Sequence, residues 1–97
     1  MPRFHVSELA EADLDGAFVW YEAQRESLGY AFLDAVEATF ARIRRAPEQF
    51  PILERGVRRA LVRRFPYAVY YLVTPDSIDV LACVHVRRDP RRWLSRR

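Results

Sequence analysis

Residues 63–93 read RRFPYAVYYLVTPDSIDVLACVHVRRDPRRW, and this stretch decides the fold. Two apolar runs, residues 65–73 and 78–86, lie on either side of the segment TPDS at residues 74–77. Both runs are rich in β-forming residues and are apolar on both faces, which is typical of strands inside a sheet. Pro, Asp and Ser favour a turn between them. The stretch therefore predicts a β-hairpin with arginines at both ends.

Two helices are predicted upstream of the hairpin. Apolar residues recur at three- and four-residue spacing over residues 8–24 and again over residues 27–46, and Ser7 is placed to cap the first helix. A short strand at residues 4–6 precedes the helices, and residues 57–64 are expected to hold a further strand although they alternate poorly. The pattern predicts an α+β fold in which an N-terminal strand and a two-helix hairpin pack on a small, mostly antiparallel sheet.

Length and composition predict one domain. A chain of 97 residues with 51% apolar residues can bury one compact core, and no linker divides it, so we expect residues 1–97 to form a single domain. No apolar stretch reaches the roughly 18–20 residues that span a bilayer, and acids lie where a signal peptide needs apolar residues. We therefore expect a cytoplasmic protein that does not bind membranes. The lone Cys83 and the aromatic residues, Trp20 among them, are interpreted as packing residues.

The charges are segregated along the chain. Residues 1–54 contain 5 arginines and 10 acidic residues, whereas residues 55–97 contain 11 arginines and 3 acidic residues. An acidic helical half and a basic sheet half are expected, and the basic half suits phosphate groups or an acidic protein segment. All 16 basic residues are arginine, which fits GC-rich codon usage, although the guanidinium fork also binds phosphates and carboxylates through paired hydrogen bonds.

His85 is the first candidate functional residue, because it lies near the end of the second hairpin strand, just before Arg87 and Arg88. Strand parity places the odd-numbered residues 79–87, including Cys83 and His85, on one face and the even-numbered residues on the other. An imidazole beside fixed cations can donate a proton to a leaving oxygen in RNA cleavage. A histidine at the sheet rim can equally serve structure by bonding to the backbone. Both interpretations stay open from the sequence.

Four arginine doublets are the second candidate site. They are Arg58 and Arg59, Arg63 and Arg64, Arg87 and Arg88, and Arg91 and Arg92. Adjacent strand residues point to opposite faces, so only one arginine of each doublet is expected to join a common surface. Eight such arginines favour a partner-binding surface over a merely solvated one. His5 and His85 lack Cys or acidic companions at ligand spacing, and no glycine-rich phosphate loop occurs, so neither a metal nor a cofactor is predicted.

The order of these motifs resembles the RelE/ParE superfamily of bacterial toxins. The motifs are Arg-Phe-Pro-Tyr at residues 64–67, an apolar run, an acidic turn, a second apolar run and His-Val-Arg-Arg-Asp-Pro at residues 85–90. The resemblance implies a helical hairpin against a curved sheet and the role of toxin in a type II toxin–antitoxin pair. It also implies a cognate antitoxin, bound in a hetero-oligomer. RelE-like members cut messenger RNA at the ribosome, while ParE-like members bind DNA gyrase.

The resemblance implies different functional residues for an RNA-cleaving toxin and for a gyrase-binding toxin. An RNA-cleaving toxin would use the strand-end Arg88 and a basic residue before the hairpin, Arg59 or Arg63, with His85 as a proton donor. Ala68 stands where RelE-like enzymes carry an arginine, and no terminal tyrosine is present, so the ParE-like activity is favoured. A non-toxic binding module on the same fold is the third hypothesis. The residues expected to bind antitoxin or target are Arg58, Arg63, Arg64, Arg87, Arg91 and Trp93.

Overall fold

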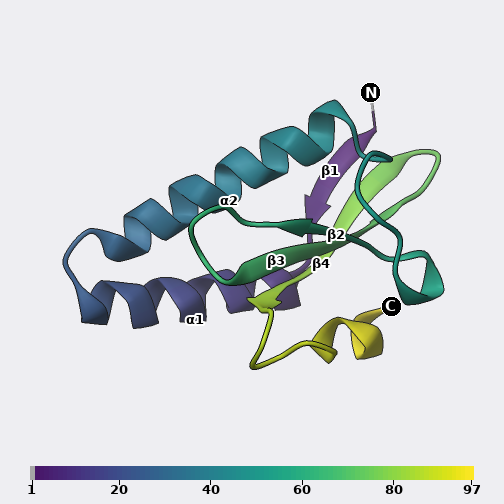
Figure 1. The fold of residues 1–97 in the computed structure, drawn as a ribbon. Coiled ribbons are helices and arrows are strands. Elements are labelled where there is room, and N and C mark those ends of the chain that lie inside the picture. The colour runs from purple at the N-terminus through teal and green to yellow at the C-terminus, as the bar shows by residue number, and fades with distance from the viewer. Residues whose placement is uncertain (1) are drawn as a thin grey trace.

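The computed structural model describes residues 2–97 and confirms the predicted α+β fold (Figure 1). Its elements in chain order are β1 (Arg3–Val6), α1 (Glu8–Gln24), α2 (Leu28–Arg45), the short 3-10 helix η1 (Glu54–Gly56), β2 (Arg58–Leu61), β3 (Tyr67–Val73), β4 (Ser77–His85) and the 3-10 helix η2 (Arg92–Arg96). The helices of the described residues include none that is long and apolar enough to cross a membrane.

The strands form one mixed sheet in the order β1-β4-β3-β2. Strand β3 runs antiparallel to both of its neighbours, β2 and β4, and β1 runs parallel to β4. The chain enters through β1 and crosses over through the two helices before it returns to build the other three strands (Figure 1). The mostly antiparallel sheet predicted from the sequence is therefore confirmed, with the single parallel pair supplied by the N-terminal strand.

Local contacts determine where the two helices begin and how closely they approach. The side chain of Ser7 accepts a hydrogen bond of 3.1 Å from the backbone N–H of Ala10, as expected of an N-cap. The start of α2 is capped differently, because the carboxylate of Glu22 accepts from the N–H groups of Ser27 and Gly29 at 3.0 and 2.8 Å. A Cβ atom at Gly29 would lie 2.8 Å from the carbonyl oxygen of Phe18, so the glycine permits close approach of the helices. These contacts fix the helical hairpin that covers the sheet.

The main core lies between the helices and the sheet, and aromatic rings fill its centre. Tyr21, Phe32 and Tyr67 pack with ring centroids 5.0–5.9 Å apart. Towards the far end of β3, the hydroxyl of Tyr71 donates a hydrogen bond of 2.6 Å to the carbonyl of Pro47. Burial raises the pKa of Tyr71 to about 12. The hydroxyl therefore stays protonated and ties the loop after α2 to the sheet.

A second, smaller core covers the opposite face of the sheet. Trp93 of η2 is 3% exposed and stacks on Tyr70 with centroids 5.2 Å apart and planes 11° apart. Its indole N–H donates to the carbonyl of Pro90 at 2.9 Å. The side chain of Trp93 is therefore enclosed by its own chain, and its role in binding a partner stays a prediction.

The predicted parity of the second hairpin strand is wrong beyond its middle. Tyr70 pairs with Ala82 while Tyr71 pairs with Val80, so Leu81 is an extra residue that forms a bulge in β4. A bulge shifts alternation by one residue. Val80 and Cys83 consequently lie in the same core beneath the helices, rather than on opposite faces. Cys83 is 1% exposed, as expected of a packing residue, and burial raises the pKa of its thiol.

Candidate functional site

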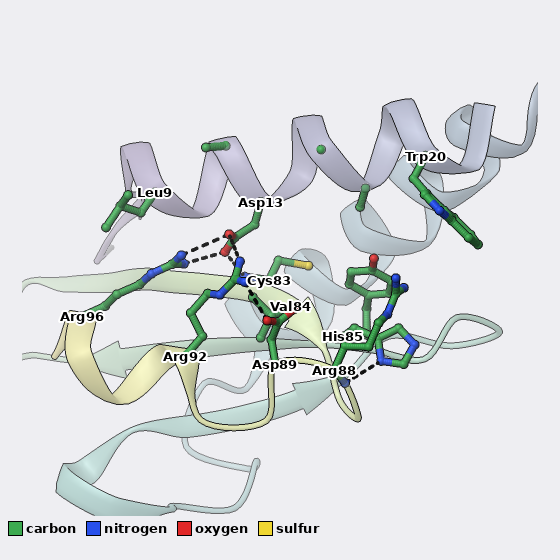
Figure 2. Close-up of a pocket in the computed structure, with 14 residues that line it drawn as sticks. Leu9, Asp13, Trp20, Cys83, Val84, His85, Arg88, Asp89, Arg92 and Arg96 are labelled. Carbon is green, nitrogen blue, oxygen red and sulfur yellow. Dashed lines mark hydrogen bonds and ion pairs between the residues drawn. The ribbon is translucent and has the colours of Figure 1, made fainter. Parts of the chain in front are cut away.

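The end of β4, helix α1 and the C-terminal segment enclose a cavity of about 480 Å³ (Figure 2). Trp20 of α1, His85 at the end of β4 and Arg88 of the following turn lie at one end of it, and Asp13 lies near the other (Figure 2). Two of the residues singled out in the sequence, His85 and Arg88, are thus brought together. The cavity is the first candidate site for a ligand or partner.

Asp13 anchors the C-terminal segment to helix α1. Its carboxylate accepts two hydrogen bonds from Arg96, at 2.5 and 3.1 Å, and one of 3.1 Å from the backbone N–H of Cys83. The side chains of Asp13 and Arg96 are only 6% and 11% exposed. Arg92 lies 3.8 Å from the same carboxylate and 2.6 Å from Asp89. Because these charges satisfy one another, this part of the cavity is structural.

His85 serves the backbone in this structure. Its Nδ1 accepts hydrogen bonds from the N–H groups of Arg87 and Arg88, at 3.1 and 3.2 Å. Figure 2 shows the bond from Arg88. Nδ1 therefore carries no proton, and a neutral ring holds its proton on Nε2. Burial lowers the pKa of His85, and the charge of Arg88 lowers it further. A neutral imidazole that caps the end of a strand is a poor proton donor at pH 7, so the geometry matches the structural interpretation.

Arg88 is held over an exposed tryptophan. The centre of its guanidinium lies 5.5 Å from the centroid of the Trp20 ring, and Trp20 is 47% exposed. Burial raises the pKa of the nearby Tyr67, and the charge of Arg88 opposes that shift. The open end of the cavity therefore presents a cation, an accessible indole and a neutral imidazole. Such a surface suits recognition of a partner with a carboxylate or phosphate beside an apolar group.

The structure separates the residues predicted for catalysis. Arg59 lines a different cavity, with Arg42, Phe50, Pro51 and Leu61. His85 and Arg88 line the cavity beside α1. The three side chains therefore do not share one pocket, although a phosphoryl-transfer site would need its cation and its acid or base within reach of the same phosphate.

The remaining predicted binding arginines fall into separate groups. Arg58 donates to the carbonyls of Glu48 and Phe50 at 3.0 and 2.7 Å, so it holds the loop before β2. Arg91 pairs with Glu54 at 3.2 Å in an exposed contact.

Arg87 is exposed in the turn that follows β4, and it is not among the residues that line the cavity at α1. Arg63 and Arg64 lie elsewhere, beside α2, where they meet Arg42 and Arg45. This proximity could not be predicted from the sequence, because it depends on how the loop after β2 folds against α2.

Two further residues of the site were not recognised from the sequence. Trp20 was treated as a packing residue, although it falls outside the apolar stripe of α1. Asp13 pairs with Arg96, which lies 83 positions away, and no local sequence pattern predicts that contact. Within residues 2–97 no group of three or more His, Cys, Asp or Glu side chains is placed to hold a metal ion.

Comparisons with known proteins agree with this architecture. A family model described as the ParE toxin of type II toxin–antitoxin system, parDE, matches residues 4–90. Proteins named Toxin ParE2 from two strains of Mycobacterium tuberculosis are 34% identical over 89 residues, which cover 91% of this chain and 85% of the relative. A solved structure titled "Chromosomal ParDE TA system from P. aeruginosa" has a similar fold, with a TM-score of 0.78, 19% identity, and coverage of 88% of this chain and 96% of the other.

A helical hairpin on a mixed sheet, together with the motifs between residues 63 and 93, defines a toxin fold of the RelE/ParE superfamily. The superfamily resemblance drawn from the sequence is confirmed. Within that superfamily, the chain belongs to the ParE toxin family of type II toxin–antitoxin systems. It is the toxin component of such a system, and membership implies an antitoxin partner.

Proposed function

We propose that this toxin arrests growth by binding DNA gyrase without catalysis, and that a cognate antitoxin neutralises it by covering the binding surface. The observation that carries the proposal is the separation of Arg59 from His85 and Arg88, which line different cavities. A binding protein does not require those groups to meet, whereas an RNA-cleaving enzyme does.

Two further features favour binding over RNA cleavage. The first is Ala68, which stands where RelE-like enzymes carry an arginine and is fully buried in the second core. The methyl group of alanine offers no cation to a phosphate. The second is His85, whose Nδ1 is occupied by backbone N–H groups and whose pKa is lowered. A lowered pKa disfavours the protonated imidazole, which is the proton donor that cleavage would need.

The surface between α1 and the end of β4 suits contact with a protein target. Exposed Trp20 supplies apolar area, and Arg88 supplies charge at its edge. Tryptophan and arginine are the residues most enriched among those that dominate binding energy at interfaces. A DNA-binding enzyme and an antitoxin are both cytoplasmic partners, so we infer that the toxin acts there, and that it forms a hetero-oligomer with the antitoxin when neutralised.

The test is a supercoiling assay with purified gyrase from the host, in which the toxin is added alone and then with its antitoxin. We expect inhibition that the antitoxin reverses. A parallel assay measures cleavage of messenger RNA on translating ribosomes. Cleavage that is lost in both His85→Gln and Arg88→Gln, with gyrase unaffected, would replace this proposal with RelE-like catalysis. Absence of both activities, and of growth arrest on induction, would leave a non-toxic binding module.

A further inference from the structure

A second apolar stripe runs along the outer side of α1, away from the core. Residues 9, 12, 16, 19 and 23 recur at alternating spacings of three and four, which is the heptad spacing by which helices pair, and residue 20 lies beside them. We call this stripe the α1 face. It consists of the exposed residues Leu9, Ala12, Gly16, Val19, Trp20 and Ala23. The inner side of α1 packs in the core through Ala10, Ala17 and Tyr21, so the core does not need the α1 face.

The α1 face exposes large apolar side chains. Leu9, Val19 and Trp20 are 56%, 65% and 47% exposed, and they are three of the six large apolar side chains exposed within residues 2–97. Single apolar residues are normal on a protein surface, whereas a contiguous group of them marks a contact site. Four members of the α1 face, Leu9 and Trp20 among them, also line the cavity beside α1. The stripe and the open side of that cavity therefore form one continuous surface.

Charges of opposite sign border the two edges of the α1 face. Successive residues of a helix are rotated by about 100°, which places Glu8 and Asp15 on one edge and Asp13 on the other. The edge of Asp13 faces the C-terminal segment, where Arg88 and Arg92 lie (Figure 2). Glu8, Asp15 and Arg88 form no ion pair among residues 2–97. One edge is therefore acidic and the other basic, and each has a charge free to pair with a partner.

We propose that the α1 face pairs two copies of this toxin, with their α1 helices face to face and parallel. A two-fold axis along the helices turns the acidic edge of each copy towards the basic edge of the other. An antiparallel pair would instead set acid against acid, which is repulsive. Ala12 and Gly16 allow close approach in the middle of the stripe, and Leu9 and Val19 of each copy would pack against their counterparts.

A second copy fits the α1 face better than a partner of one charge sign does. An acidic segment or a nucleic acid would be attracted by Arg88 but repelled by Glu8 and Asp15 along the opposite edge. The partner that matches must present apolar residues between an acidic and a basic edge. Helix α1 of this chain presents that arrangement itself.

The size of the α1 face limits the strength of the pairing. A helix of 17 residues is about 25 Å long and roughly 10 Å wide, so each copy contributes well below the roughly 800 Å² of a stable interface. We therefore expect a dimer that exchanges with the monomer, with a dissociation constant in the micromolar range. Pairing would cover Trp20 and so mask part of the surface proposed for gyrase. That masking, unlike the pairing, rests on the proposed function.

Sedimentation equilibrium of the purified toxin across the micromolar range measures the pairing. The average mass should rise with concentration towards that of two copies. Val19→Glu and Ala23→Glu place like charges opposite each other, so each should raise the dissociation constant by about tenfold or more. Ala41→Glu is the matched control, because Ala41 is an exposed alanine of α2 outside the α1 face, and it should stay within about threefold of the parent. Circular dichroism of each variant confirms that the helices are retained.

Disulfide trapping tests the parallel direction. Ala12→Cys and Ala23→Cys introduce thiols about 16 Å apart along α1. In a parallel pair each position faces its own counterpart, so each variant alone should form a cross-linked dimer under mild oxidation. Cys83 is 1% exposed and should not take part. Cross-links that form only when the two variants are mixed would show an antiparallel pair and overturn the proposed arrangement.

The outcomes separate this inference from the proposed function. A mass that stays at one copy throughout the concentration range would overturn the pairing, and so would a dimer whose dissociation constant is unchanged in both folded Glu variants. Variants that keep self-association but lose antitoxin binding or gyrase inhibition would assign the α1 face to that partner instead. Neither sedimentation nor trapping uses gyrase, so a toxin that pairs as described but never inhibits gyrase would refute only the proposed function.

Discussion

Replacing Asp13 with Asn should be among the most destabilising single changes to this chain. The carboxylate is 6% exposed and accepts three hydrogen bonds, two from Arg96 and one from the backbone of Cys83. Removing one partner of a buried ion pair costs about 3–5 kcal/mol, because the other charge stays buried without compensation. Asn keeps one acceptor oxygen, so we expect a loss of about 3 kcal/mol in the free energy of unfolding. For a domain of this size the midpoint of thermal unfolding should fall by roughly 12–24 °C.

Urea unfolding at pH 7, followed by circular dichroism, measures this loss. Asp15→Asn is the matched control, because Asp15 lies in the same helix, is exposed and makes no side-chain hydrogen bond among the described residues. The control should change stability by less than about 0.5 kcal/mol. A loss below about 1 kcal/mol for Asp13→Asn, or equal losses for both variants, would refute the claim that this pair anchors the C-terminal segment. Replacing Asp13 with Leu and Arg96 with Met together should recover part of the loss, since an apolar pair carries no desolvation penalty.

Three further predictions follow from the core. Gly29→Ala should lower the free energy of unfolding by more than about 1 kcal/mol, because the added Cβ would clash with Phe18. Gly16→Ala, which has open space around the added Cβ, should raise the free energy of unfolding by about 0.5–1 kcal/mol. Stability to urea should fall as the pH rises from about 10 to 12, because the pKa of Tyr71 is about 12 in the folded state and near 10 in the unfolded state. The fall in stability should be smaller in Tyr71→Phe. Equal falls in the parent and in Tyr71→Phe would contradict the assignment. The thiol of Cys83 should react with a disulfide reagent only after denaturant is added, and rapid labelling of the native chain would show that the core opens.

The helices and the hairpin could be predicted from the sequence because their signals are local. The cap at Ser7 and the helical spacing of apolar residues placed α1 within its observed bounds, Glu8–Gln24. The hairpin turn at residues 74–77 was placed by Pro, Asp and Ser. Each signal involves residues a few positions apart, which the sequence displays directly.

The bulge and the site could not be predicted in the same way. Leu81 forms the bulge in an unbroken apolar run, with no glycine or proline to mark it, and its effect reverses the faces on which the later residues of β4 lie. The packing of Trp93 depends on Tyr70 and on the Asp13–Arg96 pair, which are contacts between distant parts of the chain. The arginine doublets indicated a concentration of positive charge. Which arginines lie close together depends on the folded loop between β2 and β3.

The stoichiometry of gyrase inhibition tests the central claim most directly. Purified toxin is titrated into a fixed amount of gyrase, and supercoiling is measured at equilibrium. A non-catalytic inhibitor should reach full effect at about one toxin per gyrase binding site, with antitoxin restoring activity in the same proportion. Full loss of activity at toxin levels far below those of gyrase, increasing with time, would contradict this account, because only a catalyst can act on many targets in turn.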